Sequence, residues 1–397
     1  MSWIANHPST DLLLNDPGGS RSMLIERIDL YHISQQLASP FVTSFGRQDE
    51  RQCLILSLSS DGLTGWGECA ATIAPGYSYE TVTTAWHILT DFLIPAVLGR
   101  DLAEPEDIRD WSSFVRGHPL AKTSLDVAAW DLCAKRDGLA VAQKLVSPYE
   151  NSPRDRVEVG VSIGIQPSID ETLAVVEEYL DKGYRRIKLK IRPGLDLEIA
   201  RAARQAFAAT SIMLDGNSAY SMADAPLFQS MDDLELLMLE QPLENDDIYE
   251  HSQLRSLIET PICLDESILS GSHARAAIAI GACDIINIKP GRVGGLTEAR
   301  LVHDVCFEAG MPVWCGGMLE TGIGRAALLA LASLPGFTLP GDISATERYY
   351  KQDIARPQFL LNPEDSTIEV PIGPGLGVEV DMNRLSRATL RKKAFLA

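Results

Sequence analysis

Five ionisable residues recur at almost equal intervals through the second half of this chain. They are Lys190, Asp215, Glu240, Asp265 and Lys289, separated by 25, 25, 25 and 24 residues. Three carboxylates offer the hard oxygen donors that Mg²⁺ prefers, with Mn²⁺ as a possible substitute. Two lysines can carry protons on either side of such a site. The pattern therefore predicts a divalent-metal site flanked by two proton carriers.

A second amine, Lys188, precedes Lys190 by two positions. Side chains alternate along a strand, so both lysines are expected on one face. Two ammonium groups close to each other and to a metal disfavour each other's protonation, which favours Lys190 as a general base. The alternative is a pair of lysines reaching solvent from a surface strand, with each acid merely capping the next helix. Three acids in register between lysines favour the metal site.

Each of the five residues ends a short apolar run of β type. The runs are RRIKLK, SIMLD, LELLMLE, PICLD and CDIINIK. A strand, a helix and two turns together take about 25 residues, so the rhythm predicts consecutive βα units. With VEVGVSIGI before them and PVWCGG and FTLPGD after them, the chain has eight predicted strands and seven full helices.

Eight alternating units predict an α/β fold, a (β/α)7β TIM-like barrel whose C-terminal strand ends open onto one face. An open doubly wound sheet is the alternative topology, but the GxGxxG and Walker motifs of nucleotide-binding sheets do not occur in the sequence.

The N-terminal third predicts an α+β capping domain. Residues 23 to about 65 alternate apolar and polar, with Asp61-Gly62 as a hairpin turn and the stretch 40–51 as a polar loop. Residues 80–145 have helical spacing, and Gly138 is a plausible helix stop. The predicted organisation is a flexible extension over 1–22, a capping domain over 23–152, a barrel domain over 153–364, and a tail over 365–397 that returns to the capping domain.

Composition excludes several classes of partner. The net charge of −19 disfavours nucleic acid and anionic membranes, since both need a basic footprint. No apolar run reaches the length of a membrane span, and the N-terminus lacks the pattern of a signal peptide. Seven scattered cysteines without a CxxC pair fit a reducing compartment. We therefore expect a cytoplasmic protein that acts on a small molecule.

The motifs around these residues resemble those of a known family. They are KLKIRPG (188–194), LDGNSAY (214–220), LEQPL (239–243), LDESI (264–268), NIKPGRVGG (287–295), WCGGMLETGIGR (314–325) and LPGDISATERYYKQDI (339–354). Over about residues 23–397 the chain resembles the muconate-lactonising subgroup of the enolase superfamily. Within that subgroup it is similar to the o-succinylbenzoate synthase / N-succinylamino acid racemase family.

The resemblance implies roles for individual residues. Lys190 would be the base, Lys188 would modulate it, and Lys289 would be the acid/base or cation on the opposite face. Asp215, Glu240 and Asp265 would bind Mg²⁺, supported from behind by Asn217 and Glu266. The resemblance also implies that the loops at 40–50 and 69–79 cover a small carboxylate substrate, and that the protein is a homo-oligomer. The implied substrate-binding residues are Ser162, Arg292, Gly317, Met318, Leu319, Asp342 and Ile343.

Two reactions fit this site. In o-succinylbenzoate synthesis, a dehydration in menaquinone biosynthesis, Lys190 would remove a proton α to the carboxylate while Lys289 stays cationic. In N-succinylamino acid racemisation, the two lysines would alternate as base and acid, and the sequence does not separate the two activities. A non-catalytic binding barrel would call for a broken set of residues, but all five are intact. Ser344 lacks the charge with which related dipeptide epimerases grip an ammonium, which argues against a free α-amino substrate.

Overall fold

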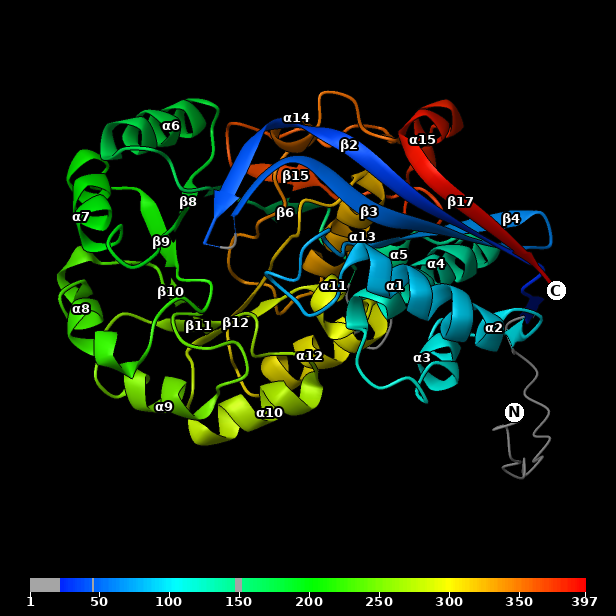
Figure 1. The fold of residues 1–397 in the computed structure, drawn as a ribbon, viewed down its shortest axis with the longest axis horizontal. Coiled ribbons are helices and arrows are strands. Elements are labelled where there is room, and N and C mark those ends of the chain that lie inside the picture. The colour runs from blue at the N-terminus through cyan, green and yellow to red at the C-terminus, as the bar shows by residue number, and fades with distance from the viewer. Residues whose placement is uncertain (1–21, 45, 147–151) are drawn as a thin grey trace.

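The computed structural model describes residues 22–44, 46–146 and 152–397. An antiparallel sheet with its helices forms one part of the molecule, and a ring of alternating strands and helices forms the other (Figure 1). The predicted extension over 1–22 falls, except for residue 22, outside the described residues. Most of the predicted boundary near residue 150 does as well.

The cap contains a four-stranded antiparallel sheet in the order β17-β2-β3-β4. Asp61 and Gly62 join β3 to β4 at φ 48° and 76°, the left-handed backbone that a two-residue hairpin turn needs, so this predicted turn is confirmed. The prediction of a loop over 40–51 was wrong, because β2 and β3 continue through it and pair as far as Thr43 and Gly46. The hairpin end is held by the barrel, since Ile165 N–H donates to Val42 O at 2.8 Å. The strands are β2 (Arg27–Thr43), β3 (Gly46–Ser60), β4 (Leu63–Cys69) and β17 (Thr389–Leu396).

The cap helices pack against this sheet. The long helix α4 (Pro119–Asp137) is buried over most of its length and approaches β4 so closely that a Cβ at Gly67 would lie 2.0 Å from Ser124 O. It ends at Gly138, as predicted, with φ 68°. The others are α1 (Val82–Ile88), a π-helical stretch (Leu89–Leu93), α2 (Ile94–Val97), α3 (Asp107–Trp111) and α5 (Val141–Val146).

Seven parallel strands form the wall of the barrel in the order β13-β12-β11-β10-β9-β8-β7. Neighbours in the sheet are neighbours in sequence, as expected of repeated βα units. The strands are β7 (Val161–Ile163), β8 (Arg186–Lys190), β9 (Ser211–Asp215), β10 (Leu239–Glu240), β11 (Ile262–Leu264), β12 (Ile285–Ile288) and β13 (Val313–Cys315). The main helices outside them are α6 (Ile169–Asp181), α7 (Leu197–Ala206), α8 (Ala225–Gln229), α9 (Tyr249–Arg255), α10 (Gly271–Ile280), α12 (Leu296–Glu308) and α13 (Gly322–Ala332) (Figure 1).

The eighth segment, FTLPGD over 337–342, takes the predicted place but is not a regular strand. It forms single parallel bridges, Val313 with Phe337 on one side and Val159 with Gly341 on the other. Pro340 lacks an N–H and cannot donate to a ladder, which accounts for the interruption. The segment nevertheless connects β13 to the residues before β7 and so completes the ring.

The C-terminal part of the chain runs from the barrel back to the cap. β15 (Thr367–Glu369) pairs with β6 (Arg156–Glu158), and β17 pairs antiparallel with β2. These contacts tie the end of the chain to both parts of the molecule. The remaining elements are β1 (Met23–Leu24), β5 (Asp101–Leu102), α11 (Pro290–Val293), α14 (Thr346–Tyr349), β14 (Ala355–Arg356), β16 (Glu379–Val380) and α15 (Met382–Ala388).

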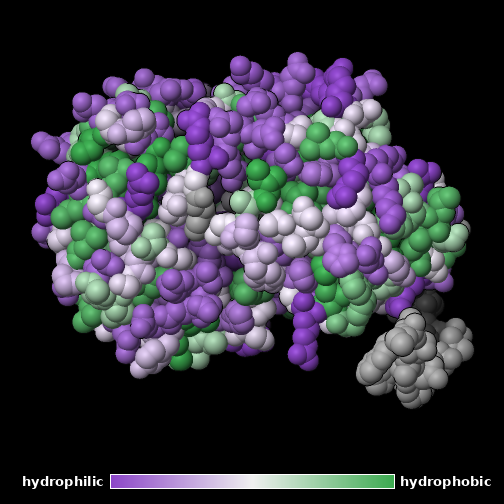
Figure 2. Space-filling view, in the orientation of Figure 1, coloured by the Kyte–Doolittle hydropathy of each residue, from purple (hydrophilic) through white to green (hydrophobic). Residues whose placement is uncertain are grey.

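The surface shown in Figure 2 is mostly hydrophilic, with apolar side chains in small scattered groups. All seven cysteines are buried and free, as the scattered spacing predicted. Within the described ranges, we find no helix with the length and apolar character needed to span a membrane.

Candidate active site

The inside of the barrel is built in layers because side chains alternate along each strand. An apolar layer, the floor, consists of Met213, Met238, Cys263, Ile285 and Trp314. Two positions further along the chain lie Asp215, Glu240, Asp265 and Asn287, which are polar, and Gly316, which has no side chain. Lys190, Asp215 and Glu240 stand in direct register across β8, β9 and β10. The evenly spaced residues of the sequence therefore form a row of ionisable side chains above an apolar layer.

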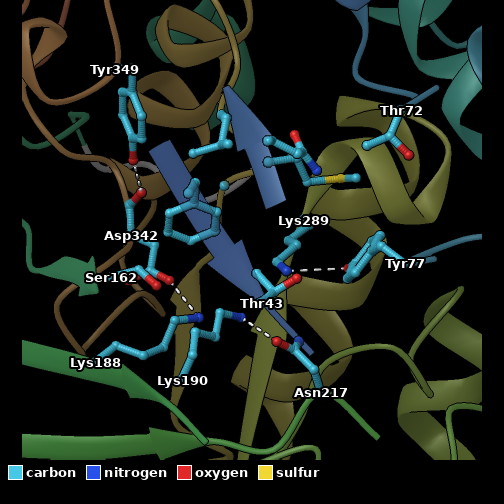
Figure 3. Close-up of a pocket in the computed structure, with 15 residues that line it drawn as sticks. Thr43, Thr72, Tyr77, Ser162, Lys188, Lys190, Asn217, Lys289, Asp342 and Tyr349 are labelled. Carbon is cyan, nitrogen blue, oxygen red and sulfur yellow. Dashed lines mark hydrogen bonds and ion pairs between the residues drawn. The ribbon is translucent and has the colours of Figure 1, made fainter. Parts of the chain in front are cut away.

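Lys190 is 9% exposed and bonds to two neighbours. Its Nζ atom lies 2.5 Å from Asp215 Oδ2 and 2.7 Å from Asn217 Oδ1. Asn217 in turn donates to Glu266 Oε1 at 3.0 Å. Asn217 therefore orients the predicted base (Figure 3), and Glu266 in turn holds Asn217.

Lys188 is the most enclosed lysine of the row, at 2% exposure. Its Nζ atom lies 2.6 Å from Asp342 Oδ2, 2.8 Å from Glu240 Oε2 and 3.0 Å from Asp215 Oδ2. Burial opposes its charge, but these three carboxylates outweigh burial and raise the pKa of Lys188 well above its ordinary value. Lys188 is therefore a fixed cation that joins the ends of β9 and β10 to the eighth segment.

The three carboxylates influence one another strongly. The pKa of Glu240 is raised, first by burial and then by the negative charge of Asp215. The pKa of Asp215 is lowered, because Lys190 and Lys188 outweigh the effect of its burial. Glu240 also accepts a hydrogen bond from Asn287 Nδ2 at 2.8 Å. Acids at such short range favour a compensating cation.

Lys289 directly follows the last residue of β12, which is four strands away from the strand that carries Lys190. Its Nζ atom lies 2.6 Å from Asp265 Oδ2 and donates to the Tyr77 hydroxyl at 3.2 Å. Arg292 binds the other oxygen of Asp265. The pKa of Lys289 is raised, since Asp265 and Tyr77 outweigh the effect of burial.

The structure does not support the two alternative roles, in which the acids cap the helices that follow them and the lysines reach solvent from a surface strand. The helical turns that follow β9 and β11 begin at Ser221 and Ser270, so Asp215 and Asp265 are not their N-caps. Lys188 and Lys190 are inside the barrel and do not extend along its surface.

A cavity of about 740 Å³, including its open mouth, lies over the row. The three lysines and Asn217 line it (Figure 3). Of the residues predicted to contact substrate, Ser162, Gly317, Met318, Leu319 and Asp342 line it as well. Ser162 Oγ is buried without a hydrogen-bond partner, so it can receive a ligand atom. Charged, amide and apolar side chains share this lining, as in sites for small organic molecules.

Two residues of the predicted substrate-binding set stand elsewhere. Ile343 is 1% exposed and packs in the main apolar core, because it alternates with Asp342 and faces away from the cavity. Arg292 stands behind Asp265 and donates to Ile268 O at 2.7 Å. Arg292 thus binds the carboxylate of Asp265 and is not one of the residues that line the cavity.

The cap supplies the roof of the cavity, at the positions expected to cover a substrate. Phe41, Thr43 and Gln48 come from the β2–β3 hairpin, and Thr72 and Tyr77 come from the following loop. Tyr77 also donates to Asp265 Oδ1 at 3.1 Å. The roof is therefore bonded directly to the row of ionisable side chains.

Sequence reasoning missed four supporting residues. Asn287 and Arg186 are interior strand positions, two residues before Lys289 and Lys188, and the two-residue alternation could have indicated them. Arg186 pairs with Asp342 at 2.6 Å. Tyr77 lies in the 69–79 loop that was expected to cover a substrate, and Gly316 lies in the motif WCGGMLETGIGR, but neither was assigned a role of its own. A Cβ at Gly316 would lie 2.6 Å from Lys289 Cε.

The carboxylates have the donor chemistry of a Mg²⁺ site, although ammonium and guanidinium groups hold them in this structure. Across the described ranges, no three His, Cys, Asp or Glu side chains stand together in an arrangement that would hold a metal as it is. Lys188 Nζ nevertheless lies within 3.0 Å of both Asp215 and Glu240, and Asp265 directly follows the neighbouring strand β11, so three hard oxygen donors come from adjacent strands. The three carboxylates thus fit Mg²⁺. Binding of the metal requires the lysine ammonium groups to move away from some of the carboxylate oxygens that they now contact.

Comparison with known proteins agrees with this architecture. Residues 27–145 match the family model "Mandelate racemase / muconate lactonizing enzyme, N-terminal domain", and residues 171–384 match "Enolase C-terminal domain-like". The cap, the barrel and the row of ionisable strand ends define an enolase-type barrel protein. The chain belongs to the mandelate racemase / muconate lactonizing enzyme family of the enolase superfamily.

Individual relatives are similar over almost the whole chain. An o-succinylbenzoate synthase of Geobacillus kaustophilus is 45% identical, with 94% of this chain and 97% of the relative covered. An N-succinylamino acid racemase of Amycolatopsis sp is 46% identical, with 93% and 99% covered. A crystal structure of an enolase superfamily member from Listeria innocua superposes with a TM-score of 0.89 at 37% identity, covering 94% of this chain and 99% of that one.

Proposed function

We propose that this protein is an o-succinylbenzoate synthase that depends on Mg²⁺. The observation that carries the proposal is the placement of Lys190 and Lys289 on strands four apart, lining one cavity with acidic strand ends between them. Relatives named o-succinylbenzoate synthase are 45% identical to this chain over most of its length.

The residues divide the reaction between them. Asp215, Glu240 and Asp265 would hold Mg²⁺, which when bound would make the proton α to a substrate carboxylate more acidic. Lys190 removes that proton from a succinyl-hydroxycyclohexadiene carboxylate and returns it to the departing hydroxyl group. One C–H and one C–O bond break, a C=C bond forms, and water leaves. Lys289 stays cationic and stabilises the anion from the other face.

N-succinylamino acid racemisation is the second candidate. Both lysines reach the same cavity, as a two-base exchange requires. Racemases in Amycolatopsis and Thermus thermophilus are as similar to this chain as the synthases. Lys190 and Lys289 would then each add or remove the α-proton on their own side.

The test is a direct assay of both reactions with purified protein and Mg²⁺. Formation of the aromatic product supports the synthase. Deuterium uptake at the α-carbon of both enantiomers of N-succinylphenylalanine in D₂O supports racemisation in addition. Absence of dehydration together with rapid exchange would reverse the order of the two candidates. Absence of both would reject the proposal.

A further inference from the structure

Three buried charged side chains lie at the boundary between cap and barrel, apart from the catalytic row. They are Arg51 on β3, Glu68 on β4 and Glu320 between β13 and α13, and together they are called the seam cluster. Their exposed fractions are 2%, 3% and 6%. Burying charge is costly unless the charge has partners, so the bonds of each residue indicate what the cluster holds.

The two carboxylates hold the barrel segment over 317–321. Glu68 accepts hydrogen bonds from Thr321 Oγ1 at 2.7 Å, Thr321 N–H at 3.0 Å and Gly324 N–H at 3.2 Å. Glu320 Oε2 accepts the Met318 N–H at 2.7 Å. A side chain of the cap sheet thus fixes the start of a barrel helix, and the segment before that helix is fixed at both ends.

This segment carries backbone strain at the cavity wall. Leu319 has φ 59°, a left-handed backbone conformation that residues other than glycine rarely adopt and that persists only where the surroundings enforce it. Leu319 O accepts a hydrogen bond from the Tyr350 hydroxyl at 2.6 Å. Met318 and Leu319 both line the cavity. The wall therefore has a shape that the segment would not adopt unaided.

Arg51 holds the other wall. Its guanidinium donates to Ala71 O at 3.2 Å and also to Ala70 O. These carbonyl groups directly precede Thr72, which lines the cavity, and the loop leads on to Tyr77. Arg51 thus fixes the beginning of the cap loop that roofs the site.

The two carboxylates of the seam cluster lie next to each other, and Arg51 is near enough to act on their charge. A Cβ at Gly324 would lie 2.6 Å from Glu320 Cβ and 2.9 Å from Glu68 Oε2, so the two acids reach the same point. The pKa of Glu68 is raised to about 7, first by burial and next by the charge of Glu320, while Arg51 counteracts the rise. A change at one carboxylate therefore alters the other.

We propose that the seam cluster is a positioning device that sets the cap loop and the 317–321 segment relative to each other, and through them the selectivity of the cavity. What the cavity binds rests on the proposed function, whereas the positioning does not. The cluster bonds to backbone groups of the two segments, and the proton-transferring lysines stand on other strands. Its loss should therefore alter substrate binding more than proton transfer.

Amide hydrogen exchange on the full chain tests the positioning without any reaction. In Glu68→Gln, amides over 317–324 should exchange about tenfold faster, and in Arg51→Met those over 70–77 should do so. Glu177→Gln, an exposed carboxylate on α6, is the matched control and should exchange like the wild type. If the other variants do not fold, Tyr350→Phe can replace them, because it removes only the hydrogen bond from the Tyr350 hydroxyl to Leu319 O. We expect it to raise amide exchange over 317–324 by a smaller factor. Unchanged exchange over 317–324 in folded Glu68→Gln would overturn the proposal.

Kinetics supplies the second measurement. Glu68→Gln should raise KM about fivefold or more with kcat changed less than about threefold, because positioning acts on binding. Glu68→Gln should also shift the preference between N-succinylphenylalanine and N-succinylalanine, or the KM for the dehydration substrate. Glu177→Gln should leave both quantities unchanged. An equal loss of kcat on every substrate, with KM and selectivity unchanged, would contradict the positioning role. An inactive wild-type protein would count against the proposed function alone, since the exchange experiment still decides the seam cluster.

Discussion

The Nζ atom of Lys190 lies 2.5 Å from Oδ2 of Asp215, its register partner across two parallel strands. This contact joins the predicted base to a predicted metal ligand 25 residues away. A divalent cation at Asp215 would compete with the ammonium group for the same oxygen. Metal binding and the availability of Lys190 are therefore linked.

Replacement of the two lysines should separate their roles. Lys190→Ala should lower the rate of dehydration about a thousandfold or more. A general base increases the rate of a reaction by about 10²–10⁴-fold, and no neighbouring side chain can replace Lys190 in that role. Lys289→Ala should remove α-proton exchange from one enantiomer of an N-succinylamino acid and spare the other. Steady-state rates and deuterium uptake measure the two effects. Appreciable dehydration by Lys190→Ala would place the base elsewhere.

Removal of divalent metal should abolish turnover and leave the fold intact. EDTA treatment followed by Mg²⁺, or Mn²⁺, should restore activity, since the ligand set consists of carboxylates. Calorimetry should detect one Mg²⁺ site in the wild type and a much weaker one in Glu240→Gln. Glu177→Gln is the control for loss of one negative charge. Full activity in the presence of EDTA would contradict the assigned ligands.

Gly316→Ala should impair catalysis through Lys289. The added Cβ would lie 2.4 Å from Asn287 Oδ1 and 2.6 Å from Lys289 Cε, so the lysine must move. Overpacking of this kind costs about 1–3 kcal/mol, and we expect kcat to fall about tenfold or more. Gly271→Ala is the control, because its nearest neighbour would be 3.6 Å away. Circular dichroism melts and kcat for the two variants provide the comparison, and equal activity would count against this packing.

Asp126 should make stability depend on pH. It lies buried on α4 and accepts the Thr297 N–H at 3.2 Å, and burial raises its pKa to about 7. A raised folded-state pKa contributes stability that is complete below the unfolded value near 4 and is lost as pH rises through about 7. A shift of about three units corresponds to at most about 4 kcal/mol.

Asp126→Asn should therefore remove part of the pH dependence. Urea unfolding at pH 5.5 and pH 8.5 should show a smaller loss of unfolding free energy in the variant than in the wild type. Glu177→Gln should behave like the wild type. An identical pH dependence in Asp126→Asn and the wild type would show that the carboxyl group does not titrate in this range.

Local sequence determined much of the barrel. The 25-residue repeat fixes one strand and one helix per unit, and alternation along each strand fixes which residues face inward. For that reason the row from Lys188 to Lys289 could be predicted as a set. Asn287 and Arg186 follow from the same alternation and could have been included. Ile343 was misplaced because it follows Asp342 directly and so faces the opposite side.

Longer-range packing decided the rest. Glu68 and Thr321 are bonded although 253 residues separate them, and no periodic pattern connects a cap strand to a barrel helix. The strained backbone of Leu319 and the contact between Tyr77 and Lys289 likewise need both parts of the molecule. The sequence alone determined which groups face the interior, since that depends on neighbours along one strand. Tertiary structure alone decided how the cavity is walled and roofed, because those contacts exist only once the cap has packed on the barrel.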